Sequence, residues 1–185
     1  MVTLSRRQTT RSALLVALAM LTVKPAFAQE DQSADDALKI MSADPRFSDW
    51  IQILQFSGLT RYAQSAEKFT AFIPTNAAFD KYPDILPELL RGRSRPFPDT
   101  DRAVEFVRSH VILDVHPLAE FSGKTATVTS MSGNPIMIDG SKAGVYSVTW
   151  TSVHGSTATA DVVGPPIVAS NAIIYPIDTV VLSSK

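Results

Sequence analysis

The chain has 185 residues, of which 45% are hydrophobic and 19% are charged. This length suits one domain, or at most two small ones, and the composition is too apolar for an intrinsically disordered protein. With 17 basic and 18 acidic residues the net charge is −1, so no overall basic excess points to nucleic acid. The absence of cysteine excludes disulfides, a thiolate nucleophile, cysteine-ligated zinc and iron–sulfur clusters.

Residues 1–28 have the features of a cleaved signal peptide. Three arginines precede an uncharged run of 11 residues, Ala13–Val23, and Ala26 and Ala28 put small side chains where a signal peptidase cuts. The run is too short for a transmembrane anchor, which needs about 20 residues. We therefore predict export, to the periplasm or to the cell exterior, without a transmembrane anchor.

Cleavage after Ala28 would remove four basic residues and no acidic one, which leaves 13 basic and 18 acidic residues. An acidic protein of this kind is not expected to bind nucleic acid or anionic membranes through its overall charge. We place one domain at residues 35–182, after a flexible lead-in at 29–34 and before a short tail at 183–185.

The first part of the domain has helical patterns. Asp35 and Asp36 put acidic residues in the first turn of a short helix that runs to about Met41. A second helix is predicted to begin at Ser48, whose hydroxyl we expect to cap it, and to end at Gly58.

Residues 68–75 are aromatic and β-branched and predict a buried strand. Thr75 and Asn76 follow it, and we expect their side chains to accept backbone N–H groups at the start of the next helix. A helical turn at Leu86–Leu90 leads into a loop that carries a small basic patch, Arg91, Arg93 and Arg95. A further helix is predicted from about residue 101 to Val111, with Val104 and Val107 facing inward.

After Gly123 the composition favours β structure. Runs of β-branched residues alternate with turns, and the predicted strands are Thr125–Met131, Ile136–Ile138, Val145–Val153, Thr157–Val163, Ile167–Ser170 and Ile173–Leu182. Helices in the first half followed by short strands predict a single α+β domain.

Three segments resemble the signatures of fasciclin-like domains. Phe69–Phe79, FTAFIPTNAAF, is similar to the first signature, and Ile167–Leu182, IVASNAIIYPIDTVVL, to the second. Between them Phe106–Leu113, FVRSHVIL, is similar to the helix that carries a histidine in this family. The resemblance covers about residues 35–182 and implies a single-domain, exported bacterial member. Its fold would have helices, mainly from the first half, packed on a β-sandwich or wedge formed mainly by the second half.

The signature residues suit scaffold roles. We expect the amide of Asn171 to bridge two backbone segments and the carboxylate of Asp178 to need partners if it is buried. The full set of expected structural residues is Phe72, Pro74, Thr75, Asn76, Phe79, Asn171 and Asp178.

The chain also departs from the family pattern. Ser109 stands before His110 where many members have tyrosine, and Tyr175 stands where many have histidine. The segment linked to integrin recognition in animal members has no carboxylate here, so integrin-type binding by that route is not expected. Ala172 stands where the family usually has glycine. The backbone at this position therefore either avoids a positive φ or adopts one with strain.

The sequence offers little for catalysis. His110, Asp114 and His116 lie within seven residues, but their spacing matches no metal motif, and a packed His110 with a loop His116 is the simpler interpretation. We expect no enzymatic activity, no cofactor and no metal ion.

Two functions remain open. The resemblance implies an adhesion or interaction module for a protein or polysaccharide at the cell envelope or a host surface, acting as a monomer or weak homo-oligomer. Its candidate contact residues are His110, Ile167, Tyr175, Arg91, Arg93 and Arg95. The alternative is a carrier of a lipophilic, pigment-like molecule, with a pocket lined by Met131, Met137, Tyr146 and Trp150. Threonines at 125, 127 and 129 would form a flat polar face for a polymer, although threonine is also simply favoured in strands.

Overall fold

A computed structural model describes residues 35–91, 100–152 and 155–182. The predicted signal peptide, lead-in and tail lie outside the described residues, as do Arg93, Arg95 and His154. No helix of the described part is long and apolar enough to cross a membrane.

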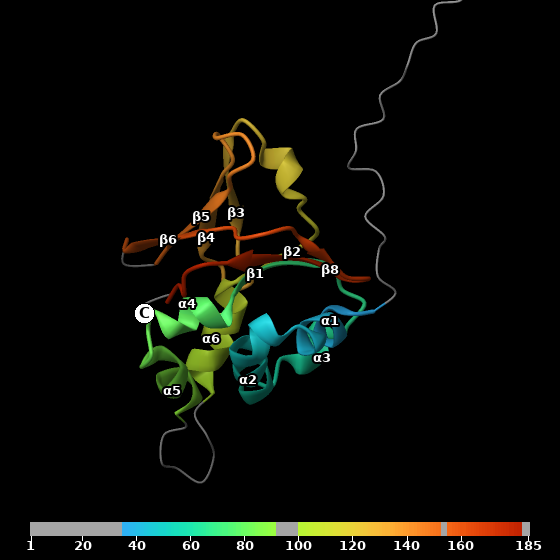
Figure 1. The fold of residues 1–185 in the computed structure, drawn as a ribbon, viewed down its shortest axis with the longest axis vertical. Coiled ribbons are helices and arrows are strands. Elements are labelled where there is room, and N and C mark those ends of the chain that lie inside the picture. Colours follow the sequence, from blue (N-terminus) through green and yellow to red (C-terminus); the bar gives the residue numbers. More distant parts are fainter. Residues whose placement is uncertain (1–34, 92–99, 153–154, 183–185) are drawn as a thin grey trace, which may run out of the picture.

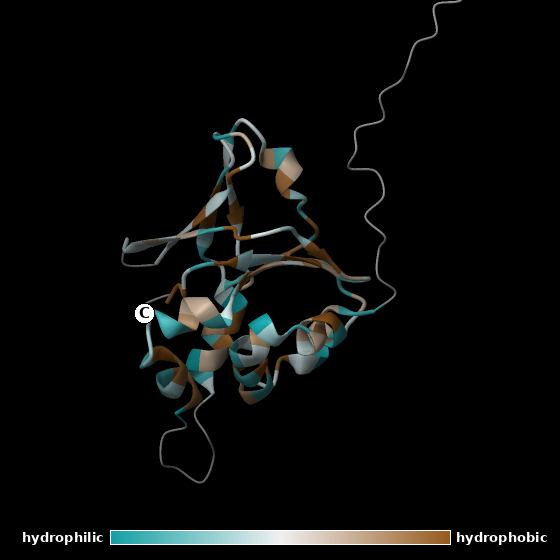
Figure 2. Cartoon of the chain, in the orientation of Figure 1, coloured by the Kyte–Doolittle hydropathy of each residue, from teal (hydrophilic) through white to brown (hydrophobic). Residues whose placement is uncertain are grey.

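Short amphipathic helices form one layer of the domain. They are α1 (Ala37–Ala43), α2 (Ser48–Phe56), α3 (Thr60–Ala63), α4 (Asn76–Asp80), α5 (Ile85–Leu90) and α6 (Asp101–Ser109), with a 3₁₀ turn at Pro45–Phe47 before α2. Hydrophobic and hydrophilic residues alternate along them (Figure 2), as expected of helices that cover a core with one face. Asp36 is the N-cap of α1 rather than part of its first turn, because its carboxylate accepts the N–H of Lys39.

The helix predicted to run to Val111 is shorter than expected. α6 ends at Ser109, and Val111–Leu113 form a strand, β2, which pairs with the strand that follows α3. Val104 is half-buried, whereas Phe106 and Val107 both face the core. The prediction of a continuous helix was wrong because pairing with a neighbouring strand satisfies the backbone of 111–113 better than one more helical turn would.

The first sheet, sheet A, lies between the helices and the rest of the domain (Figure 1). Its strand order is β2-β1-β8-β7, where β1 is Phe69–Pro74, β8 is Ala172–Ile177 and β7 is Ile167–Val168. β1 and β8 run parallel, so strands from the two ends of the domain pair at its centre. Every residue of these two strands is buried.

Alternate side chains of sheet A enter two different cores. Phe69, Ala71 and Ile73 pack with the helices, whereas Phe72 belongs to a second core together with Tyr175. Because both faces are covered, these strands read as continuous apolar runs in the sequence rather than as alternating ones.

The second sheet, sheet B, is an antiparallel meander in the order β3-β4-β5-β6. Its strands are Thr125–Thr129, Pro135–Asp139, Ser147–Thr151 and Thr157–Asp161. The inner face packs on sheet A through Ile136, Ile138, Val148 and Trp150, which are all buried. The architecture is therefore a helical layer, a central sheet and an outer sheet, which confirms the predicted α+β class.

Candidate interaction surface

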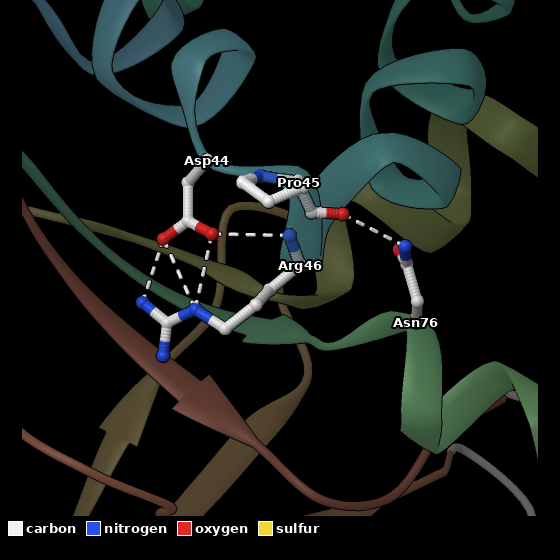
Figure 3. A network of polar contacts seen from close by, with 4 residues as sticks. All are labelled: Asp44, Pro45, Arg46 and Asn76. Carbon is white, nitrogen blue, oxygen red and sulfur yellow. Dashed lines mark hydrogen bonds and ion pairs between the residues drawn. The ribbon is translucent and has the colours of Figure 1, made fainter.

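Asn76 of the first signature joins three elements instead of capping its own helix. Its Oδ1 accepts the N–H of Asp49 in α2 at 3.2 Å, and its Nδ2 donates to the Pro45 carbonyl at 2.9 Å and to the Ser48 hydroxyl at 2.8 Å (Figure 3 draws the bond to Pro45). Among the described residues, the Thr75 side chain makes no capping bond to α4. Thr75 does occupy the N-cap position of α4, but with its backbone carbonyl alone. The expected side-chain caps by Asn76 and Ser48 were wrong, because the Asn76 amide binds the start of α2 and Ser48 is the first residue of that helix.

The turn before α2 is held by an ion pair. The Asp44 carboxylate accepts two hydrogen bonds from Arg46, one from the backbone N–H at 3.0 Å and one from the guanidinium Nη2 at 2.6 Å (Figure 3). These hydrogen bonds lower the pKa of Asp44, although partial burial opposes them. Together with Asn76 they fix the 3₁₀ turn against the end of β1.

Asn171 of the second signature is buried and ties three backbone segments together. Its Oδ1 accepts the N–H of Ala37 at 2.9 Å, and its Nδ2 donates to the carbonyls of Ala63 at 3.0 Å and Ser65 at 2.7 Å. The neighbouring Ala172 has no positive φ, so the replacement of glycine causes no strain there.

Asp178 follows β8 and links it to sheet B and to α4. Its Oδ1 accepts the N–H of Asp161 at 2.9 Å and the Thr179 hydroxyl at 2.9 Å, and its Oδ2 pairs with Lys81 Nζ at 3.1 Å. Burial raises the pKa of Asp178, but these hydrogen bonds and the lysine charge outweigh burial and lower it. The carboxylate has a structural role at the junction of all three layers.

The hydrophobic signature residues lie in the cores. Phe72 is fully buried, and its ring stacks on Tyr175 with centroids 5.5 Å apart. Pro74 pairs with Ile177 at the end of β1, and Phe79 lies beside Phe106 at 6.2 Å. All three side chains are buried, so none of them is available to a binding partner at the surface.

His110 is fully buried and lies where the helical layer meets both sheets. Its Nδ1 donates to the Phe106 carbonyl at 2.8 Å, which identifies the protonated ring nitrogen because a carbonyl only accepts. The rings of Trp50, Phe106 and Trp150 surround it at 4.5–5.6 Å. Its Nε2 has no hydrogen-bond partner among the described residues, and burial lowers the pKa of His110 to about 4.

The six candidate contact residues differ widely in accessibility. The Tyr175 hydroxyl accepts the N–H of Leu118 at 2.9 Å and donates to the His116 carbonyl at 3.2 Å, and the side chain is buried. A partner on the surface therefore reaches neither Tyr175 nor His110, which corrects the expectation for both. Ile167 is half-buried on the edge strand β7, and Arg91 is exposed at the end of α5, whereas Arg93 and Arg95 lie outside the described residues.

The residues His110, Asp114 and His116 do not form a metal site. His116 lies 3.7 Å from Glu120, and the Asp114 carboxylate accepts the N–H of Val115 at 2.7 Å. Asp114 adopts a φ of 99°, which positions the turn after β2 at the cost of backbone strain. In the described part of the chain, no three histidine, aspartate or glutamate side chains are placed to hold a metal ion together.

The predicted lining of a ligand pocket is dispersed. Met131 borders a cavity of about 20 Å³ among the helices, and Trp150 borders another of about 60 Å³ at the end of sheet B. Met137 is 39% exposed on the outer face of sheet B. A water molecule occupies roughly 10–15 Å³ on this measure, so these two cavities hold a few waters and not a pigment.

The outer face of sheet B is a regular surface whose side chains alternate with more deeply buried ones along each strand. Cross-strand pairing places Thr127, Met137, Thr149 and Thr159 in one row, and Thr129 with Pro135 and Thr151 with Thr157 in the next. The sequence carries a signal for this face, because threonine occupies alternate positions in three of the strands: 125, 127 and 129, then 149 and 151, then 157 and 159. Sequence reasoning identified only 125, 127 and 129 since the register between strands is not visible in the sequence.

This chain belongs to the Fasciclin domain family, whose sequence model matches residues 45–183. It is 30% identical over 145 residues to sll1735, an uncharacterized protein of Synechocystis sp. (strain ATCC 27184 / PCC 6803 / Kazusa), and that match covers 78% of this chain and 96% of the relative. Fasciclin domains are generally non-enzymatic, adhesion-type modules that are extracellular or exported.

The fold is similar to that of a solved FAS1 domain pair from the insect cell adhesion molecule Fasciclin I. The TM-score is 0.64 at 19% sequence identity, and the match covers 81% of this chain and 51% of that one. The chain thus spans about half the length of the solved pair, and the likeness concerns the fold alone.

Proposed function

We propose that the protein is an exported, non-enzymatic adhesion module that binds a protein or polysaccharide at the cell envelope or at a host surface. Residues 1–28 support export because they have the pattern of a signal peptide. Membership of the Fasciclin family supports an interaction role.

One structural observation carries the proposal. The polar signature side chains Asn76, Asn171 and Asp178 all bind the protein's own backbone, and His110 is enclosed by aromatic rings. These groups are therefore committed to the scaffold, whereas the outer face of sheet B is exposed and regular. Such a division suits a module that presents a surface rather than one that encloses a substrate.

The test is saturable binding of the purified, fluorescently labelled protein to intact cells of its source organism. We expect binding that saturates and that the unlabelled protein displaces. Pretreating the cells with a protease removes protein partners, whereas periodate oxidises the vicinal diols of polysaccharides, so the two treatments identify the class of partner. Binding that neither saturates nor is displaced would contradict an adhesion role.

A further inference from the structure

We infer that His110 is an acid-sensitive switch: when its imidazole gains a proton, the end of α6 moves away from the two sheets while the sheets themselves stay paired. This inference goes beyond the proposed adhesion function, because it concerns a conformational change of the domain and not its partner. It rests on the position of His110 at the point where the three layers meet.

The first support is that two consecutive residues join the three layers. The carbonyl of His110 accepts the N–H of Phe72 at 3.0 Å, which continues the pairing of β1 with β2. The carbonyl of Ser109 accepts the indole N–H of Trp150 in β5 at 2.9 Å. The last turn of α6 is thus bonded to sheet A through one carbonyl and to sheet B through the one before it. A displacement of His110 therefore releases both sheets from α6 together.

The second support is the enclosure of the side chain. The centroid of the His110 ring lies 5.6 Å from that of Trp50 in α2, 4.5 Å from that of Phe106 in α6 and 5.4 Å from that of Trp150 in β5. The residue has no exposed surface. Because rings from all of these elements surround it, the imidazole reaches water only if α2 or α6 separates from β5.

The third support is that the enclosed ring has no acceptor for a second proton. Nδ1 donates to the Phe106 carbonyl at 2.8 Å, whereas Nε2 has no hydrogen-bond partner among the residues that the structure describes. The Ser109 hydroxyl lies 3.1 Å from Nδ1 and so does not serve Nε2. Protonation adds an N–H at Nε2, and a buried charge with an unpaired donor is costly. The imidazolium therefore favours a conformation in which the ring is hydrated.

No charged group compensates the imidazolium inside the domain. The strands β1, β2 and β5 contain no charged residue. The charged residues of the two helices are Asp49 in α2 and Asp101, Arg102, Glu105 and Arg108 in α6. Burial lowers the pKa of His110 to about 4 although the Phe106 carbonyl raises it, and no charged side chain contributes to the shift. Hydration is thus what remains to stabilise the cation.

The size of the effect follows from the two pKa values of His110. The imidazole has a pKa of about 4 when enclosed and the ordinary value of 6.5 when hydrated. Because the enclosed form has the lower pKa, it is fully favoured above pH 6.5 and loses this advantage as the pH falls toward 4. The equilibrium constant for opening should therefore rise about a hundredfold between about pH 7 and about pH 4.

The experiment measures hydrogen exchange by NMR in the ¹⁵N-labelled protein from about pH 7 to about pH 4, with each rate corrected for the intrinsic exchange rate at that pH. The reporters are the Phe72 amide and the Trp150 indole N–H, which bond to the end of α6. The control is the amide of Gly140, which donates to the Lys124 carbonyl at 3.0 Å within sheet B. We expect protection to fall about a hundredfold at both reporters and to change little at Gly140.

Two results in the native chain would overturn the inference. Constant protection of Phe72 and Trp150 would show that protonation does not open the junction. An equal loss at Gly140 would show that acid unfolds the whole domain, including sheet B, instead of releasing α6. Both comparisons use the native chain alone, so they do not depend on whether a variant folds.

A substitution then identifies the titrating group. His110→Asn keeps an N–H donor for the Phe106 carbonyl and does not titrate, so the pH dependence of protection at Phe72 should disappear. His116→Gln is the matched control at a partly exposed histidine and should keep the hundredfold change. A change of the same size in His110→Asn would assign the opening to another group and overturn the inference.

Discussion

The two sheets of this domain contain similar β-branched residues but bury them differently. In sheet A the central strands β1 and β8 are buried at every position, because helices cover one face and sheet B covers the other. In sheet B the strand β4 alternates between exposed and buried positions, since only its inner face meets the core. The order of the layers, rather than the composition of the strands, therefore decides which side chains stabilise the fold and which are available to a partner.

The largest effect is expected for truncation in the core between the sheets. Phe72→Ala removes a fully buried ring that stacks on Tyr175 and meets Trp150 edge-on at 6.1 Å. We expect the free energy of unfolding to fall by about 3–5 kcal/mol, measured by urea denaturation. Met137→Ala on the exposed face of sheet B is the control and should cost less than about 1 kcal/mol. Similar losses in both variants would break the contrast between the sheets.

The next effect is a dependence of stability on pH that arises at His110. Its pKa is about 4 in the folded protein, because burial lowers it from the ordinary 6.5. The unfolded chain therefore gains a proton before the folded one, so the stabilisation is complete above pH 6.5 and is lost as the pH falls toward 4. The loss amounts to about 3 kcal/mol.

Urea denaturation at a series of pH values measures this loss. His110→Asn keeps an N–H donor at the position of Nδ1 for the Phe106 carbonyl and does not titrate, so the stability of this variant should vary much less across the window. His116→Gln makes the same kind of substitution at a partly exposed histidine and serves as the matched control. A native protein whose stability stays constant from pH 6.5 to 4 would contradict a neutral, enclosed His110.

A smaller loss of stability is expected when the hydrogen bonds of the buried Asn171 amide are removed. Asn171→Ala leaves the N–H of Ala37 and the carbonyls of Ala63 and Ser65 without their partner. We expect a loss of about 2 kcal/mol in the free energy of unfolding, since buried polar groups would remain unpaired. Asn171→Asp should be at least as harmful, because its carboxylate would face two carbonyl oxygens. A thermal melt of both variants provides the check, and a neutral Asn171→Ala would show that water replaces the amide.

The smallest effects come from one substitution made in each sheet. Thr70→Val in β1 removes a buried hydroxyl that donates to the Asp114 carbonyl at 2.9 Å and accepts the N–H of His116 at 2.8 Å. We expect this change to cost about 1–2 kcal/mol. Thr127→Val on the exposed face of sheet B should change stability by less than about 0.5 kcal/mol. Equal effects on the urea midpoint would show that exposure does not distinguish the two sheets.

Much of the local structure was predictable from the sequence. The strand at Phe69–Pro74 and the start of the second helix at Ser48 were located because their apolar residues follow the period of their element. The predicted strands of the second half were mostly too long: the segment 145–153 contributes only Ser147–Thr151, and the last strand ends at Ile177. Strand ends depend on where a partner strand stops, and that information lies elsewhere in the chain.

The candidate site was less predictable. Asn76 reads as a local cap, but it binds α2, whose start lies 28 residues earlier in the chain. His110 and Tyr175 read as contact residues because of their place in the family signatures, and tertiary packing encloses both. The threonines of sheet B were visible individually, whereas their arrangement in rows depends on the register of three strand pairs.

The sequence by itself determined the class of fold, the family and most of the secondary structure, because these depend on periodicity and on signature residues that are adjacent in the chain. Only the tertiary structure decided the parallel pairing of β1 with β8, the burial of His110 and the exposed threonine face. The physical reason is that burial and hydrogen-bond partners are properties of contacts between distant segments, so the same threonine or histidine is a structural or a surface residue according to what packs against it.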